Sequence, residues 1–214
     1  MSIFRLGLLI CCFFVLAGCT TRPSVTGSVP LKKPTSIAEI GNYTASGKIL
    51  LVNGSDKQSG YFFWRRSESG YQFVVSTILG IDVFSLKVNE NNAVVYVDGK
   101  EHNGDDPQLL LQSLTGQTLP LQHISKWLIG RVEGRGVFNL QKFTSGRPER
   151  FVFSPNSATT PLPTKVPTKM PINSSWSVHY QQYQSVDGLW LPSQIQISSS
   201  LNRIKLRINN WDLF

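Results

Sequence analysis

The chain has 214 residues, of which 41% are hydrophobic and 11% aromatic, and a formal net charge of +8. This length fits one domain of ordinary size, or at most two small ones, with enough apolar residues for a core. The basic charge suits an anionic partner such as a lipid surface, an acidic protein or a nucleic acid. Because no zinc-finger spacing, Rossmann glycine pattern or RNA-binding signature is present, we do not expect a nucleic-acid partner.

The first 18 residues have the pattern of a signal peptide. Arg5 is followed by the apolar run "LGLLICCFFVLAG", which is too short for a confident transmembrane helix. The run leads into "LAGC", residues 16–19, which closely resembles a bacterial lipobox. We therefore expect residues 1–18 to be removed and Cys19 to be acylated, the alternative being an uncut membrane anchor.

The segment after the lipobox predicts a tether. Cys19 is the one cysteine left after cleavage, so the exported chain has no disulfide and must be held together by packing. By resemblance to enteric sorting signals, Thr20 rather than Asp at the next position predicts the outer membrane. Residues 19–35 contain three prolines and little periodicity, which is typical of an extended linker.

The domain that follows, residues 36–214, is predicted to be mainly β. A short helical turn is expected within 36–43. Closely spaced β-branched and aromatic segments then predict an antiparallel sheet of about eleven strands. Ten of these segments are 43–53, 59–66, 70–77, 82–88, 92–99, 136–143, 150–154, 174–183, 188–200 and 202–214. The proline-rich segment Pro155–Pro171 cannot be a central strand and is interpreted as a solvated insertion.

Two short apolar helices are expected between the fifth and sixth of these segments. In residues 106–116, Asp106 is a candidate N-cap, Pro107 occupies the first helical position and Gly116 is a stop signal. In residues 119–130, Pro120 marks the start and Gly130 the end. Both helices are so apolar that each must lie on a hydrophobic surface.

No catalytic or metal site can be assembled from the sequence. His102, His123 and His179 are isolated, and there is neither an H-E-x-x-H motif nor a G-x-S-x-G motif. The adjacent Asp105 and Asp106 are better explained by a helix N-terminus than by a catalytic pair. We therefore expect a protein that is not an enzyme and has no cofactor or metal.

Four segments resemble the LolB family of outer-membrane lipoprotein receptors, within the LolA/LolB-like group. The segments are "YFFWRR" (61–66), "TILGIDVFSL" (77–86), "LLQSLTGQTLPLQHISKWLIG" (110–130) and "RIKLRINNW" (203–211). They occur in the family's order behind a lipobox. The resemblance implies an incompletely closed antiparallel β-barrel whose short helices cover a hydrophobic cavity. It also implies a receptor that takes lipoproteins from the periplasmic chaperone LolA, binds their acyl chains and inserts them into outer-membrane phospholipid without nucleotide hydrolysis. We expect the chain to be a monomer.

The resemblance also predicts a role in membrane insertion for the apolar residues 78–81, which lie between two predicted strands. A turn in water should be polar, yet Ile78, Leu79, Gly80 and Ile81 are almost entirely apolar. In the family the corresponding loop projects from the barrel and carries an exposed leucine, here Leu79, that is needed for delivery into the membrane. Many relatives have proline where Ile78 stands, and the segment Pro155–Pro171 is longer than the family's usual connection.

Strand alternation and helix periodicity predict the cavity lining. The candidates are Ile49, Leu51, Phe62, Trp64, Phe84, Leu86, Ile195, Ile197, Leu206 and Ile208 from the strands, and Leu110, Leu114, Ile124 and Leu128 from the helices. A structural outer-membrane lipoprotein, a carrier of other hydrophobic ligands and a lipid-modifying enzyme remain alternative functions.

Overall fold

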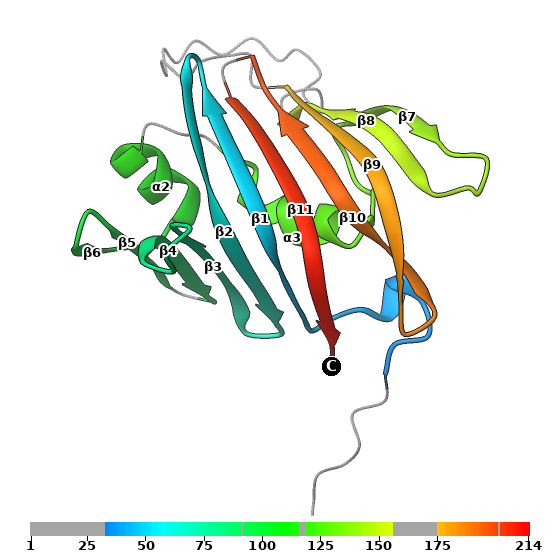
Figure 1. Ribbon diagram of the computed structural model, residues 1–214, viewed down its shortest axis with the longest axis horizontal. Helices are drawn as coiled ribbons and strands as arrows, with labels where there is room; N and C mark the ends of the chain where they lie inside the picture. Colours follow the sequence, from blue (N-terminus) through cyan, green and yellow to red (C-terminus); the bar gives the residue numbers. More distant parts are fainter. Residues whose placement is uncertain (1–32, 91, 116–118, 156–174, 201) are drawn as a thin grey trace, which may run out of the picture. The chain divides into compact units, whose positions relative to one another are not determined.

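The computed structural model describes residues 33–90, 92–115, 119–155, 175–200 and 202–214 (Figure 1). The predicted signal peptide, Cys19, most of the tether and most of the segment Pro155–Pro171 lie outside these residues. Within the described ranges, no helix has the length and apolar character needed to cross a bilayer.

The described residues form one 11-stranded sheet, one 3-10 turn and two α-helices. In chain order these elements are η1 (Ile37–Glu39), β1 (Tyr43–Asn53), β2 (Asp56–Ser67), β3 (Gly70–Ser76), β4 (Asp82–Asn89), β5 (Asn92–Val97), β6 (Lys100–Gly104), α2 (Pro107–Thr115), α3 (Leu121–Leu128), β7 (Val137–Lys142), β8 (Pro148–Phe153), β9 (Trp176–Val186), β10 (Leu189–Ser198) and β11 (Asn202–Leu213).

The sheet is antiparallel throughout and does not close. Its strand order is β6-β5-β4-β3-β2-β1-β11-β10-β9-β8-β7, so only the pairing of β1 with β11 joins strands that are distant in the chain. The end strands β6 and β7 are not paired with each other. The expectation of a mainly β, incompletely closed antiparallel barrel with short helices is therefore confirmed (Figure 1).

The one strand that the sequence patterns missed is β6. Its sequence, KEHNG, contains no β-branched or large apolar residue, and it pairs only with β5 at the edge of the sheet. Edge strands can be short and polar because half of their backbone faces water. Strand β6 therefore forms because its backbone pairs with β5, and its side chains give no sign of a strand.

Inward and outward side chains alternate along the central strands as expected. In β11, Ile204, Leu206 and Ile208 are buried, whereas the arginine and lysine between them are exposed. The register between β1 and β11 shifts at Ser46 and Gly47, which pair with Asn210 and Ile208, so the extra residue lies in β11 and β1 keeps its alternation. A Cβ atom at Gly47 would lie 2.0 Å from the carbonyl oxygen of Arg207, so only glycine lets these two strands approach.

Helix α3 is fixed to the sheet by hydrogen bonds and aromatic packing. The buried hydroxyl of Tyr43 on β1 donates to the carbonyl oxygen of Ser125 at 2.6 Å. The hydroxyl of Tyr180 on β9 donates to the carbonyl oxygen of Trp127 at 2.9 Å. Burial raises the pKa of both tyrosines, so both remain protonated donors. Trp127 packs edge-on against Phe151, with ring centroids 5.3 Å apart.

The helix boundaries follow the capping signals in the sequence. The carboxylate of Asp106 accepts hydrogen bonds from the amides of Gln108 and Leu109 at 2.8 and 3.1 Å, which confirms it as the N-cap of α2. At the end of α3, the amide of Gly130 donates to Trp127 O and the amide of Arg131 donates to Lys126 O. This pair of bonds is a Schellman motif, with Gly130 at φ +76°.

Replacement of Gly130 by alanine should therefore destabilise the fold. An L-residue at positive φ is strained by about 1–2 kcal/mol, and the new Cβ would lie 3.4 Å from the ring of Pro192. We expect the free energy of unfolding, measured by urea titration, to fall by about that amount. Gly54 also has positive φ but has no atom within 4 Å of an added Cβ, so Gly54→Ala isolates the backbone contribution. A Gly130→Ala protein as stable as wild type would contradict this interpretation of the helix end.

Candidate functional site

An apolar cavity of about 490 Å³ lies between the sheet and the two helices. Its wall is formed by seven consecutive strands of the sheet, in the order β5-β4-β3-β2-β1-β11-β10, together with α2 and α3. The apolar wall residues are Ile49, Leu51, Val52, Phe62, Trp64, Phe73, Val75, Val83, Phe84, Val97, Leu111, Leu114, Leu119, Ile124, Leu128, Ile197, Ile204 and Leu206. A space of this size and character suits a hydrophobic ligand.

The structure brings ten of the fourteen predicted lining residues to this wall. These are Ile49, Leu51, Phe62, Trp64, Phe84, Leu114, Ile124, Leu128, Ile197 and Leu206. The other four lie outside it: Leu86, Ile195 and Ile208 are buried in the surrounding core, and Leu110 is half-buried on α2. Ile195 is paired with the fully buried Tyr180, and this part of the interior is filled by the aromatic side chains that hold α3.

Several lining residues were not among the sequence candidates. Phe73 and Val75 on β3, and Leu111 on α2, face the cavity. In the run "YQFVV", Tyr71, Phe73 and Val75 share one face and Gln72 and Val74 the other, so alternation is the signal that could have identified Phe73 and Val75. In α2 three consecutive leucines leave the helix orientation open, and the structure turns Leu111 rather than Leu110 inward.

The cavity wall becomes polar at one end, which marks its mouth. Asn53, Asp56 and Gln58 line the cavity from the exposed β1–β2 hairpin. Asp98 lines it from the β5–β6 turn, and Arg203 from the start of β11. A ligand with an apolar tail and a polar head would therefore place its head at this end.

The loop between β3 and β4 is ordered but exposes its apolar side chains. Ile78, Leu79 and Ile81 are 72%, 82% and 62% exposed. The amide of Thr77 donates to Ile81 O at 2.8 Å, and the amide of Gly80 donates to Thr77 O at 3.0 Å. The Thr77 hydroxyl also accepts a hydrogen bond from the Ile81 amide at 3.2 Å. Because each exposed side chain forgoes about 1.5–3 kcal/mol of burial, this arrangement indicates a non-aqueous contact.

The apolar loop is continuous with the cavity. Val83, two residues after Ile81, lines the cavity wall and is itself 45% exposed. The next residue, Phe84, lies further along the same wall. The cavity wall therefore begins two residues after the exposed loop, with Asp82 between them.

The three histidines do not gather at this site. His102 lies in β6, His179 in β9 and His123 in α3. Burial, and secondarily the charge of Lys126, lower the pKa of His123, whose ring stacks on Trp127 and packs at a tilt against Phe153. Within the described ranges, no group of three or more histidine, cysteine, aspartate or glutamate residues could hold a metal ion.

The family-model and curated-protein comparisons agree on one family. The family model described as "Outer membrane lipoprotein LolB" matches residues 41–211. A protein of Shewanella baltica (strain OS155) named "Outer-membrane lipoprotein LolB" is 28% identical over 197 residues, covering 92% of this chain and 84% of its own. One of the same name from Aeromonas salmonicida is 25% identical, covering 100% and 97%. Among solved structures, a LolA superfamily protein from Nitrosomonas europaea has 8% identity and a TM-score of 0.47, covering 82% of this chain and 87% of its own.

Proposed function

Because the chain belongs to the LolB family of outer-membrane lipoproteins, we propose that it accepts other lipoproteins from the periplasmic chaperone LolA and inserts them into the outer membrane. The chain is an outer-membrane lipoprotein with a role in lipoprotein localization. The LolB family is a family of lipoprotein receptors and not of enzymes, which agrees with the expectation from the sequence that the chain has no catalytic activity.

The observation that carries the proposal is the apolar cavity that opens beside an exposed apolar loop. In the proposed complex, acyl chains of the cargo lie against the wall formed by β1–β5, β10, β11 and the helices. The ester and amide groups of the cargo's lipidated terminus face the polar mouth, where Asn53, Asp56 and Arg203 offer hydrogen-bond partners. This placement keeps the polar groups of the lipid out of the apolar interior, where burial without a partner is costly.

No nucleotide is needed in the proposed transfer. Exposing an acyl chain to water costs about 0.8 kcal/mol per CH₂ group. If the chains pass from the chaperone's interior to this cavity and then to the bilayer, each step exchanges one apolar environment for another. The relative affinities of the chaperone, the cavity and the bilayer for the acyl chains then set the direction of transfer. The cavity must therefore bind the acyl chains more weakly than the bilayer does.

The proposal assigns the anchor and the tether as well. Residues 1–18 are the signal peptide, Cys19 carries the lipid and residues 19–35 link the bilayer to the barrel domain 36–214. The chain then acts as a monomer on the periplasmic face of the outer membrane, where the loop Ile78–Ile81 contacts phospholipid.

A transfer assay tests the function. Chaperone–lipoprotein complex is mixed with liposomes that carry the full lipid-anchored chain, and the cargo is followed by flotation. We expect cargo to enter the liposome fraction only when the chain is present, without ATP. A structural lipoprotein would leave the cargo on the chaperone, a carrier of other ligands would bind free lipid only, and a lipid-modifying enzyme would change the cargo's mass.

A charge placed in the cavity should block uptake. Phe84 lines the wall and is not fully buried, so Phe84→Glu can keep the fold while its carboxylate repels acyl chains. We expect cargo uptake, measured by photo-crosslinking to the chain, to fall on the order of tenfold or more, the effect of about 1.4 kcal/mol. Ser85→Glu, on the outer side of the same strand, is the matched control. Full uptake by a folded Phe84→Glu protein would show that the acyl chains bind elsewhere.

A further inference from the structure

A second, shallow hollow of about 560 Å³ lies on the outer face of the sheet, across β2, β1, β11, β10 and β9. Its charged lining residues are Lys48, Lys205 and Arg207, which we call the cationic patch. All three are exposed, and their neighbours Ile49 and Leu206 point to the opposite, buried face. The cationic patch is therefore separated from the acyl-chain cavity by the thickness of the sheet.

The strand register forces these like charges together. Lys48 on β1 is directly opposite Arg207 on β11, and Leu50 is opposite Lys205. Directly opposed side chains in an antiparallel pair have Cβ atoms about 4.5–5.5 Å apart, and like charges there are destabilising. An arrangement that works against stability points to an external anion that offsets it.

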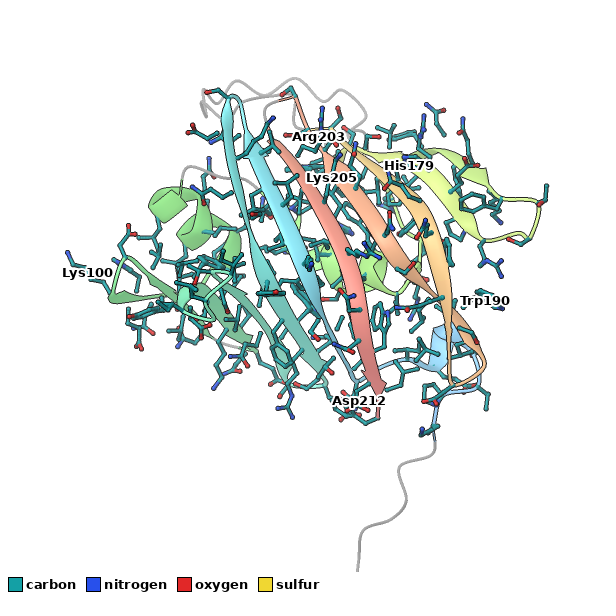
Figure 2. All side chains as sticks on the ribbon, in the orientation of Figure 1. Lys100, His179, Trp190, Arg203, Lys205 and Asp212 are labelled. Atoms are coloured by element: carbon teal, nitrogen blue, oxygen red, sulfur yellow. The ribbon has the colours of Figure 1, made fainter. Side chains whose placement is uncertain are left out.

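No carboxylate of the described chain offsets the cationic patch. The hollow contains no aspartate or glutamate; its other polar side chains are Ser59, Tyr61, Gln181 and Gln194. The ion pairs among the described residues involve Lys33, Lys126 and Arg131, and none includes a residue of the cationic patch. In Figure 2, Lys205 and Arg203 lie on the upper half of β11, whereas Asp212 lies at its lower end.

The cationic patch is continuous with the apolar loop. Ile78, which is 72% exposed, forms part of the rim of the same hollow. Cations therefore lie directly beside apolar side chains on one surface. A bilayer interface has the complementary arrangement, with anionic phosphates immediately above acyl chains.

We propose that the cationic patch binds the phosphate groups of anionic phospholipids while the loop Ile78–Ile81 enters the bilayer. The inference rests on the proposed function, because it assigns a headgroup contact to the same membrane-facing loop. The guanidinium of Arg207 can bind one phosphate through two hydrogen bonds, and the ammonium groups of Lys48 and Lys205 add attraction without strict geometry. The cationic patch then sets the angle at which the barrel meets the membrane.

The test uses the full lipid-anchored chain in vesicles, with an environment-sensitive dye on Ile81→Cys. The vesicles contain phosphatidylcholine alone or mixed with phosphatidylglycerol. We expect phosphatidylglycerol to increase the inserted fraction of the loop, and high salt to remove the increase. In Lys48→Gln/Lys205→Gln/Arg207→Gln, the insertion equilibrium on anionic vesicles should weaken by about fivefold per replaced cation, while insertion into phosphatidylcholine is unchanged.

A control of equal net charge separates the cationic patch from overall charge. Lys100, Arg135 and Lys142 are exposed on or beside the edge strands β6 and β7, so their replacement by glutamine should leave insertion as in wild type. An equal response of both triple variants to phosphatidylglycerol overturns the inference. The inference is also overturned if the variant of the cationic patch loses cargo uptake but inserts its loop normally. That result would make the cationic patch a site for an acidic protein. If wild type inserts in neither vesicle, the loop's membrane role in the proposed function fails, and with it this inference.

Discussion

Replacement of Leu79 by glutamate should leave the chain able to accept cargo but unable to deliver it. Leu79 is 82% exposed at the tip of the hydrogen-bonded β3–β4 loop and is not part of the cavity wall, so neither the fold nor the cavity depends on it. Delivery is measured as the rate at which crosslinkable cargo leaves the chain for the liposome bilayer. We expect uptake to be unchanged and this rate to fall at least about 30-fold, since the leucine's transfer into an apolar phase is worth about 2–3 kcal/mol.

Leu109 provides the matched control for this substitution. It lies on α2, is 55% exposed and does not line the cavity. Leu109→Glu introduces the same charge on another exposed leucine, and we expect normal delivery. Normal delivery by Leu79→Glu would mean that the loop's apolar tip has another partner, and a loss of uptake would mean that the loop takes part in receiving cargo.

Most of the sheet could be predicted because its strands bury one face. Ile204, Leu206 and Ile208 alternate with cationic residues, so the strand can bury only the isoleucine and leucine face. The structure shows this orientation. The edge strand β6 could not be found this way because its position comes from backbone pairing with β5. The register shift of β11 opposite Ser46–Gly47 was also not predicted, because it depends on how closely the two strands approach.

The candidate cavity was predictable only in part. Alternation identifies inward-facing residues, but it does not say which part of the interior is empty. Leu86 and Ile195 face inward yet lie in filled core. The part of the interior beside Ile195 is filled where α3 docks, through aromatic contacts with β8 and a hydrogen bond to β9 that join residues far apart in the chain. Sequence patterns within one element carry no information on that packing.

Replacement of Trp127 by alanine should be among the most destabilising changes in the domain. Trp127 is 1% exposed, and its ring packs edge-on against Phe151 and Phe153 at centroid distances of 5.3 Å. Removal of such a side chain from a core costs about 3–5 kcal/mol, a large share of the roughly 5–15 kcal/mol that stabilises a typical domain. We expect urea unfolding to show this loss and the midpoint of thermal unfolding to fall by roughly 6–20 °C.

The Trp127→Ala protein should also lose cargo uptake, because α3 carries Ile124 and Leu128 of the cavity wall. Trp190→Ala is the matched control, since Trp190 is 47% exposed and has the guanidinium of Arg147 4.6 Å above its ring. That contact is worth about 0.5–1 kcal/mol at an exposed site, so uptake should be retained. If Trp127→Ala were destabilised as expected but took up cargo normally at a temperature where it is folded, α3 would not be needed to cover the cavity. If it were no less stable than Trp190→Ala, the aromatic cluster would not be what fixes α3 to the sheet.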